Sequence, residues 1–225
     1  MSTAVLPCHA EIDLAALMAS PRLPDYARAI NERLSDEAAR RRQFYQDMSD
    51  DCKVEFIDGE VILHSPAKAR HVWVKANILR MLQNFAIHRD LGHVMDEKAL
   101  CVFPRNDYEP DIVFFGPEKS AWIEPGTMKF PVPDLAVEVL SESTEKRDRG
   151  VKFEDYEAHG VREYWIVDAE ASFVEQYIAR DGRYDLRMKS SNGELESVVV
   201  PGFRVPVAAF FDAKLSLSVM QSLLG

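Results

Sequence analysis

The chain has 225 residues, of which 47% are hydrophobic and 28% charged, the composition of an ordinary globular protein. No apolar run approaches the roughly 20 residues of a membrane-spanning helix, and His9, Glu11 and Asp13 interrupt any signal-peptide core, so we expect a cytoplasmic protein without membrane contact. The net charge of −10 argues against binding duplex DNA through charge alone but is compatible with an acidic site that holds a metal.

The N-terminal part of the chain differs from the rest. Residues 1–33 have weak periodicity and contain Pro7, Pro21 and Pro24, which predicts a partly helical extension. Residues 34–48 are polar, include the run Arg40 to Arg42, and predict a surface helix. We therefore expect the main domain to cover residues 34–225.

The first elements of the main domain follow from local patterns. Asp58-Gly59 separates two short apolar runs within residues 54–64, the strongest short signal for a β-hairpin. A helical period from about residue 68 to residue 90 ends at Gly92. Residues 93–103 and 109–115 predict two strands joined by a polar turn at residues 104–107.

A second group of elements follows a loop rich in proline and glycine. Residues 134–140 predict a buried strand, and Ser143 or Thr144 can cap a helix that runs to about His159. Another apolar strand covers residues 163–168, a β-meander extends to about residue 211, and a short helix ends the chain. This mixed order of elements predicts an α/β core with antiparallel additions.

Two acids stand out by their positions. Glu138 lies in the middle of an otherwise apolar strand, where an unpartnered carboxylate would be costly. Asp111 follows Pro110 at the mouth of another strand. If these strands are neighbours, the two carboxylates converge, and a divalent cation would offset their repulsion. A few hard oxygen ligands suit Mg²⁺, with Mn²⁺ as the other candidate.

Basic residues on the next helix complete the pattern. Lys152 and Asp148 are four residues apart, so they share one face of the predicted helix, and Asp148 is expected to orient the lysine. An ammonium beside a bound metal can stabilise negative charge on a phosphate or orient a water molecule. Lys146, Arg147 and Arg149 form a basic spot where a phosphodiester could dock.

Each of these residues also has an ordinary structural interpretation. Glu138 could form a structural ion pair with Lys152 or Arg147, because buried ion-pair networks also contain perturbed acids. Asp111 could serve as a turn or cap residue, and Lys152 could be a solvated helix charge.

The sequence contains, in this order, the blocks 55–60, His71, Pro110-Asp111, 134–141, 148–152, Tyr156 and 160–168. Together these blocks resemble the pattern of the bacterial Uma-two-type restriction endonucleases, and the resemblance covers roughly residues 35 to 210. This family is assigned to the PD-(D/E)XK nuclease-like fold, which implies a restriction-endonuclease-like mixed sheet flanked by helices, here with an added antiparallel meander.

The resemblance also implies roles for individual residues. Asp111, Glu138 and the backbone carbonyl of Val139 would be metal ligands. The superfamily motif has a lysine two places after the glutamate, where this sequence has Leu140, and in this family the role is given to the helix lysine, here Lys152. Supporting roles would then fall to Glu60, from the first layer of the fold, and to His71, at the start of a helix. Glu60 would join the metal shell, and His71 would contact a phosphate or cap its helix.

The implied function is a Mg²⁺-dependent endodeoxyribonuclease that hydrolyses DNA phosphodiester bonds. A homodimer is a further expectation, because cutting both strands of a duplex usually needs two sites. The displaced lysine and the acidic surface favour an alternative, a catalytically silent protein that acts as a binding or regulatory module. A different metal-dependent hydrolase ranks last, because the sequence has no His-Glu-x-x-His, Gly-x-Ser-x-Gly or P-loop motif.

Overall fold

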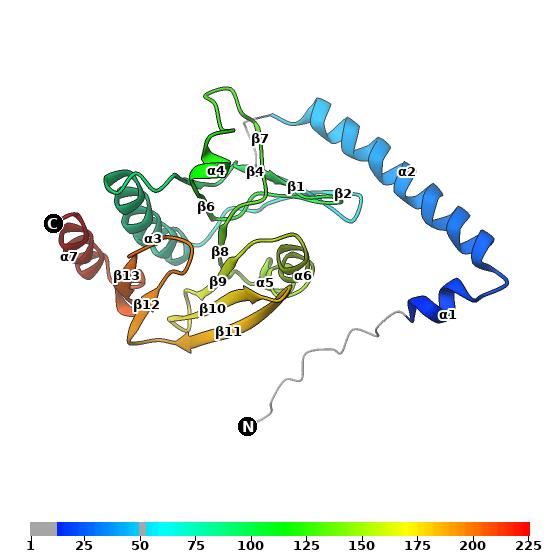
Figure 1. Cartoon of the computed structure of the whole chain (residues 1–225). Coiled ribbons are helices and arrows are strands. Elements are labelled where there is room, and N and C mark those ends of the chain that lie inside the picture. The colour runs from blue at the N-terminus through cyan, green and yellow to red at the C-terminus, as the bar shows by residue number, and fades with distance from the viewer. Residues whose placement is uncertain (1–12, 50–52) are drawn as a thin grey trace. The chain divides into compact units, whose positions relative to one another are not determined.

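The computed structural model describes residues 13–49 and 53–225, and it divides the chain into two units, Met1–Asp47 and Met48–Gly225 (Figure 1). The first unit contains the short helix α1 (Leu14–Met18) and the long helix α2 (Leu23–Asp47). Helix α2 begins earlier than residue 34, where we expected the main domain to start. Pro24 lies in its first turn, where a missing backbone N–H needs no partner, so this proline does not interrupt the helix. The first twelve residues of the predicted extension lie outside the described part of the chain.

The second unit opens with the predicted hairpin. Strands β1 (Val54–Ile57) and β2 (Glu60–Leu63) pair in antiparallel fashion, and the turn residues Asp58 and Gly59 have φ values of 53° and 85°. Positive φ at both positions is what a type I′ turn requires, and this hairpin is confirmed. It belongs to a five-stranded sheet of order β2-β1-β5-β4-β7, completed by β4 (Leu100–Val102), β5 (Asp107–Tyr108) and β7 (Lys129–Phe130).

A six-stranded sheet of order β11-β10-β9-β8-β6-β3 forms the centre of this unit. Strands β8 and β9 are parallel, and every other neighbouring pair is antiparallel, so the sheet is mixed, as predicted. The predicted meander, expected after residue 168 and up to about residue 211, is confirmed only in its first part, which adds β10 and β11 to this sheet. Its later part forms β12 (Glu194–Glu196) and β13 (Arg204–Pro206), which pair in a separate two-stranded sheet. The strands are β3 (His93–Asp96), β6 (Ile112–Phe115), β8 (Leu135–Val139), β9 (Glu163–Asp168), β10 (Phe173–Arg180) and β11 (Arg183–Ser190).

Two predicted strands were wrong in extent. The segment 93–103 is divided into β3 and β4, which belong to different sheets, because Lys98 takes a left-handed conformation with φ of 66° and turns the chain. The segment 109–115 forms a strand only from Ile112 onward. Pro110 has no N–H to donate to a neighbouring strand, so pairing starts after it.

The single helix expected from residue 143 or 144 to residue 159 was also wrong. The structure has two helices there, α5 (Glu145–Asp148) and α6 (Val151–Ala158), separated at Gly150. The backbone of Gly150 passes so close to the preceding turn that a Cβ atom at this position would lie 2.7 Å from the carbonyl oxygen of Lys146. The break therefore depends on glycine, and it sets the direction in which α6 presents Lys152.

Both faces of the six-stranded sheet are covered. On one face, α3 (Ala69–His88) packs over the odd-numbered residues of β8, Leu135, Val137 and Val139, and α7 (Ala213–Leu224) packs against α3 (Figure 1). On the other face, Ala136 packs with aromatic residues of α6 and of the five-stranded sheet. None of the helices in the described residues is both long and apolar enough to cross a membrane. The remaining elements are α4 (Pro117–Ser120), β12 (Glu194–Glu196), β13 (Arg204–Pro206) and the 3-10 helix η1 (Val207–Phe210).

Candidate active site

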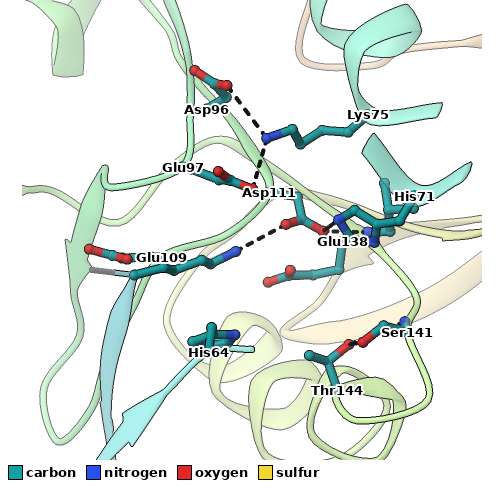
Figure 2. Close-up of polar contacts among 12 residues, drawn as sticks. His64, His71, Lys75, Asp96, Glu97, Glu109, Asp111, Glu138, Ser141 and Thr144 are labelled. Atoms are coloured by element: carbon teal, nitrogen blue, oxygen red, sulfur yellow. Dashed lines mark hydrogen bonds and ion pairs between the residues drawn. The ribbon is translucent and has the colours of Figure 1, made fainter. Parts of the chain in front are cut away.

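Asp111 and Glu138 lie opposite each other at one end of the central sheet. Ile112 of β6 pairs with Val137 of β8 in an antiparallel register, so the next residues outward are Asp111 and Glu138. Cross-strand partners point to the same face of a sheet, and Figure 2 shows the two side chains side by side. Both are buried, with exposed fractions of 4% and 3%. The structure thus brings the two predicted acids together on one face.

Lys152 reaches these acids from α6. Its side chain is fully buried, and Nζ lies 2.9 Å from Glu138 Oε1, 2.9 Å from Glu55 Oε1 and 3.5 Å from Asp148 Oδ1. The Tyr156 hydroxyl also donates to Glu138 Oε1, at 3.0 Å. Asp148 belongs to α5 and not to the helix of Lys152, but it still lies beside the ammonium. One ammonium is therefore shared by three carboxylates.

This imbalance of charge determines the protonation of Glu138. Burial, followed by the nearby charges of Asp148 and Asp111, raises the pKa of Glu138 to about 8, although Lys152 acts in the opposite direction. Burial alone would lower the pKa of Lys152, but Glu138, Glu55 and Asp148 hold it well above its ordinary value. Lys152 is therefore a permanent cation, and Glu138 keeps its proton at neutral pH unless a further positive charge is present.

Asp111 has a different environment. Lys53 Nζ donates to Oδ1 at 3.0 Å, the backbone N–H of Val139 donates to Oδ2 at 2.9 Å, and His71 Nε2 lies 3.6 Å from Oδ2. Burial would raise the pKa of Asp111, but these groups, Lys53 foremost, lower it well below its usual range. Asp111 is therefore ionised. Val139 contacts the site through its N–H, and its carbonyl stays a predicted metal ligand.

Two residues of this site were missed by the sequence interpretation. Glu55 is fully buried in β1 and pairs with Lys152, and Lys53 pairs with Asp111. Glu55 carries the same signal that identified Glu138, an acid between apolar strand residues. Lys53 lies just before its strand and has no such signal.

Glu60, which we expected to join the metal shell, does not lie among the buried acids of the site. This residue is exposed at the start of β2 and makes no ion pair or hydrogen bond with the other candidate residues within the described part of the chain. The buried acid that the hairpin supplies is Glu55.

The predicted supporting and basic residues differ in whether their polar atoms form hydrogen bonds. Within the described residues, Nδ1 of His71, Nε of Arg147 and both carboxylate oxygens of Asp148 are buried without a hydrogen-bond partner. Arg149 is occupied, because its guanidinium pairs with Glu175 at 2.7 Å and with Glu145 at 3.0 Å. Of the predicted basic spot, only Lys146 is exposed.

The carboxylates of Asp111 and Glu138 could supply part of the ligand shell of a divalent cation, with water molecules as the remaining ligands. Among the described residues, no group of three or more histidine, cysteine, aspartate or glutamate side chains is arranged to hold a metal ion. Asp111 and Glu138 alone offer facing carboxylates, and Mg²⁺ is commonly bound by one or two carboxylates while it retains several water molecules. The raised pKa of Glu138 and the carboxylate of Asp148, whose oxygens accept no hydrogen bond from any described residue, both mark an excess of acceptors that a cation would offset.

Comparisons with known proteins agree with this architecture. The model of the Uma2 family, described as "Putative restriction endonuclease", matches residues 41–208, which is more than half of the chain. The uncharacterized protein sll1609 of Synechocystis is 28% identical over 148 residues, covering 64% of this chain and 83% of that protein.

A solved structure shares the fold. The crystal structure of a "putative nuclease belonging to DUF820" from Anabaena variabilis superimposes with a TM-score of 0.65 at 16% sequence identity, and the match covers 81% of this chain and 97% of that one. The mixed sheet flanked by helices, expected from the order of the elements and from the resemblance, is therefore the fold of a known nuclease-like protein.

Proposed function

The chain belongs to the Uma2 family of restriction-endonuclease-like proteins, and on this basis we propose that it is a metal-dependent endonuclease that hydrolyses DNA phosphodiester bonds. The observation that carries the proposal is the meeting of Asp111, Glu138 and Lys152 on one face of the sheet, from three separate elements. A structural ion pair would need one acid and one base. Here a second acid faces the first across two strands, which a structural ion pair does not require.

In this proposal Asp111 and Glu138 hold Mg²⁺ or Mn²⁺, with the carbonyl of Val139 as a further ligand. The bound ion would neutralise charge on the scissile phosphate and lower the pKa of an attacking water. Glu138 gives up its proton when it takes up this role. Lys152, fixed by Glu55 and Glu138, places a permanent positive charge beside the phosphate. Lys53 places a second positive charge beside Asp111.

Incubation of supercoiled plasmid with the protein tests the proposal. We expect nicked and linear products with Mg²⁺ or Mn²⁺ and none with EDTA. Asp111→Asn and Glu138→Gln keep side-chain size and remove charge, and each should abolish cleavage. The matched control is Asp185→Asn, which changes an exposed aspartate paired with Arg180 on the meander and should cleave like the wild type. Cleavage that survives both site substitutions would refute the proposal.

One observation favours the alternative of a catalytically silent binding module. Lys53 and Lys152 already pair with Asp111 and Glu138 at 3.0 and 2.9 Å, so the acids have cationic partners without any metal. A silent module would bind neither Mg²⁺ nor Mn²⁺ in calorimetry, and the wild type would leave plasmid intact with every divalent ion tested.

A further inference from the structure

His64 lies on the same face of the first hairpin as the residues that build the site. Its backbone N–H donates to the carbonyl oxygen of Lys53, which continues the antiparallel register of β1 and β2 by one pair. Cross-strand partners and alternate residues of a strand share a face. His64, Lys53 and Glu55 therefore point the same way, and the latter two contact Asp111 and Lys152. In the view of Figure 2, the carboxylates of Asp111 and Glu138 lie between His64 and His71.

The imidazole of His64 is held by a buried carboxylate. Its Nε2 lies 2.9 Å from Oε2 of Glu55, and the side chain of His64 is 10% exposed. The other oxygen of Glu55 is also fixed, because it accepts from the backbone N–H of Glu109 at 3.0 Å and contacts Lys152. Glu55 therefore cannot turn away, and it sets the orientation of the ring.

The protonation of this pair follows from the acid. Burial opposes ionisation, but Lys152 and then His64 lower the pKa of Glu55 to about 2, so it is a carboxylate at neutral pH. A carboxylate only accepts hydrogen bonds, so Nε2 of His64 must carry the proton that it donates to Glu55. Nδ1 has no hydrogen-bond partner in the described part of the chain and is not among the fully buried unpaired atoms. It is therefore the nitrogen open to another group.

We propose that His64 is a further catalytic residue of this site, a general acid that protonates the leaving oxygen, and that Glu55 is its positioning residue. The inference rests on the proposed nuclease function. In the step, a water oxygen bonds to phosphorus and releases a proton to solvent, while the phosphorus bond to the leaving oxygen breaks. The step starts from the imidazolium form of His64, in which Nδ1 also carries a proton and the carboxylate of Glu55 balances the charge of the ring. Nδ1–H passes its proton to the leaving oxygen. The ring becomes neutral, keeps Nε2–H on Glu55, and takes up a proton from solvent before the next cycle.

The chemistry of the leaving group separates this role from a structural one. An alkoxide leaving from DNA needs a proton, whereas 4-nitrophenolate leaves without one. We therefore compare wild type, His64→Gln and His64→Asn on plasmid DNA and on bis(4-nitrophenyl) phosphate, both with Mn²⁺. The control is His88→Gln, which changes an exposed histidine at the end of α3. Thermal unfolding followed by circular dichroism establishes that each variant is folded, and two variants are used in case one is not.

We expect the His64 variants to lose about 10²- to 10⁴-fold in kcat on DNA but less than about tenfold on the nitrophenyl ester, with His88→Gln unchanged on both. In a third variant, His64→Ala, added imidazole should restore part of the DNA cleavage, and this rescue decides the case if the ester is not a substrate. The role of His64 would be overturned if its variants lost equal activity on both substrates, or if they cleaved DNA at the wild-type rate. It would also be overturned if the ester were not a substrate and imidazole did not restore DNA cleavage. These outcomes would leave the proposed nuclease function standing. A wild type that cleaves neither substrate would instead overturn the proposed function, and this inference with it.

Discussion

The ammonium nitrogen of Lys152 lies 2.9 Å from Oε1 of Glu138, although the two residues are 14 positions apart and belong to α6 and β8. Both side chains are almost completely withdrawn from solvent. In such surroundings a charged group is tolerated only with its partner, because water cannot replace it. The same contact that would serve catalysis therefore also stabilises the fold, and the two effects need separate measurements.

The first prediction concerns stability. Lys152→Met should lower the free energy of unfolding by about 3–5 kcal/mol, because Glu55 loses its counter-charge and Glu138 loses a hydrogen-bond donor inside the protein. Urea unfolding of the metal-free protein measures this change. The exposed Lys214 of α7 supplies the control, since Lys214→Met should change stability by no more than about 0.5 kcal/mol. A loss as small as that of the control would mean that Lys152 is not the counter-charge of these acids.

The second prediction is a pH dependence. The pKa of Glu138 is about 8 in the folded protein against an ordinary value of 4.5. Between these values the folded protein binds a proton that the unfolded chain has released, so the stability of the metal-free protein should fall as pH rises through this window. Glu138→Gln cannot ionise and should flatten the fall.

Glu109 contributes in the same direction, because burial raises its pKa to about 7, so Glu138→Gln should remove only part of the slope. Urea titrations at a series of pH values measure this. An unchanged slope in Glu138→Gln would show that this residue does not hold the proton.

The third prediction concerns metal binding. Because Glu138 must release its proton to bind Mg²⁺, the affinity for Mg²⁺ should increase between about pH 6 and pH 8. Calorimetry in buffers of different ionisation enthalpy should record protons released on binding. Asp111→Asn should abolish the binding heat. An affinity that does not change with pH would argue that Glu138 is not a ligand.

The fourth prediction concerns an acid outside the site. Glu163 is fully buried and accepts hydrogen bonds from Trp165 Nε1 and Gln176 Nε2, both at 2.6 Å, and from Ser197 and the backbone N–H groups of residues 198 and 199. Glu163→Gln replaces one acceptor by a donor that faces other donors, and it should cost about 2–3 kcal/mol in chemical unfolding. The exposed Glu170→Gln should be neutral. A neutral Glu163→Gln would show that these contacts do not fix the loop that follows β12.

Local patterns in the sequence were sufficient for the elements that depend on neighbours along the chain. The Asp58-Gly59 hairpin, the helix now bounded as Ala69–His88 and the buried strand around Glu138 follow from turn chemistry and periodicity, which act over a few residues. The buried strand also identified its acid, because an isolated carboxylate among apolar residues is costly wherever the strand lies.

Only the tertiary structure decided which strands pair and which charges meet. Nothing near Lys98 in the sequence indicates that the chain changes sheet there. At Gly150 the glycine itself is a local signal that the sequence interpretation did not use, because its backbone passes close to Lys146, four residues earlier. The contacts of Lys53 with Asp111 and of Glu55 with Lys152 join residues 58 and 97 positions apart (111 − 53 and 152 − 55). Such pairs are set by sheet register and burial, which are properties of the folded chain and have no local signature.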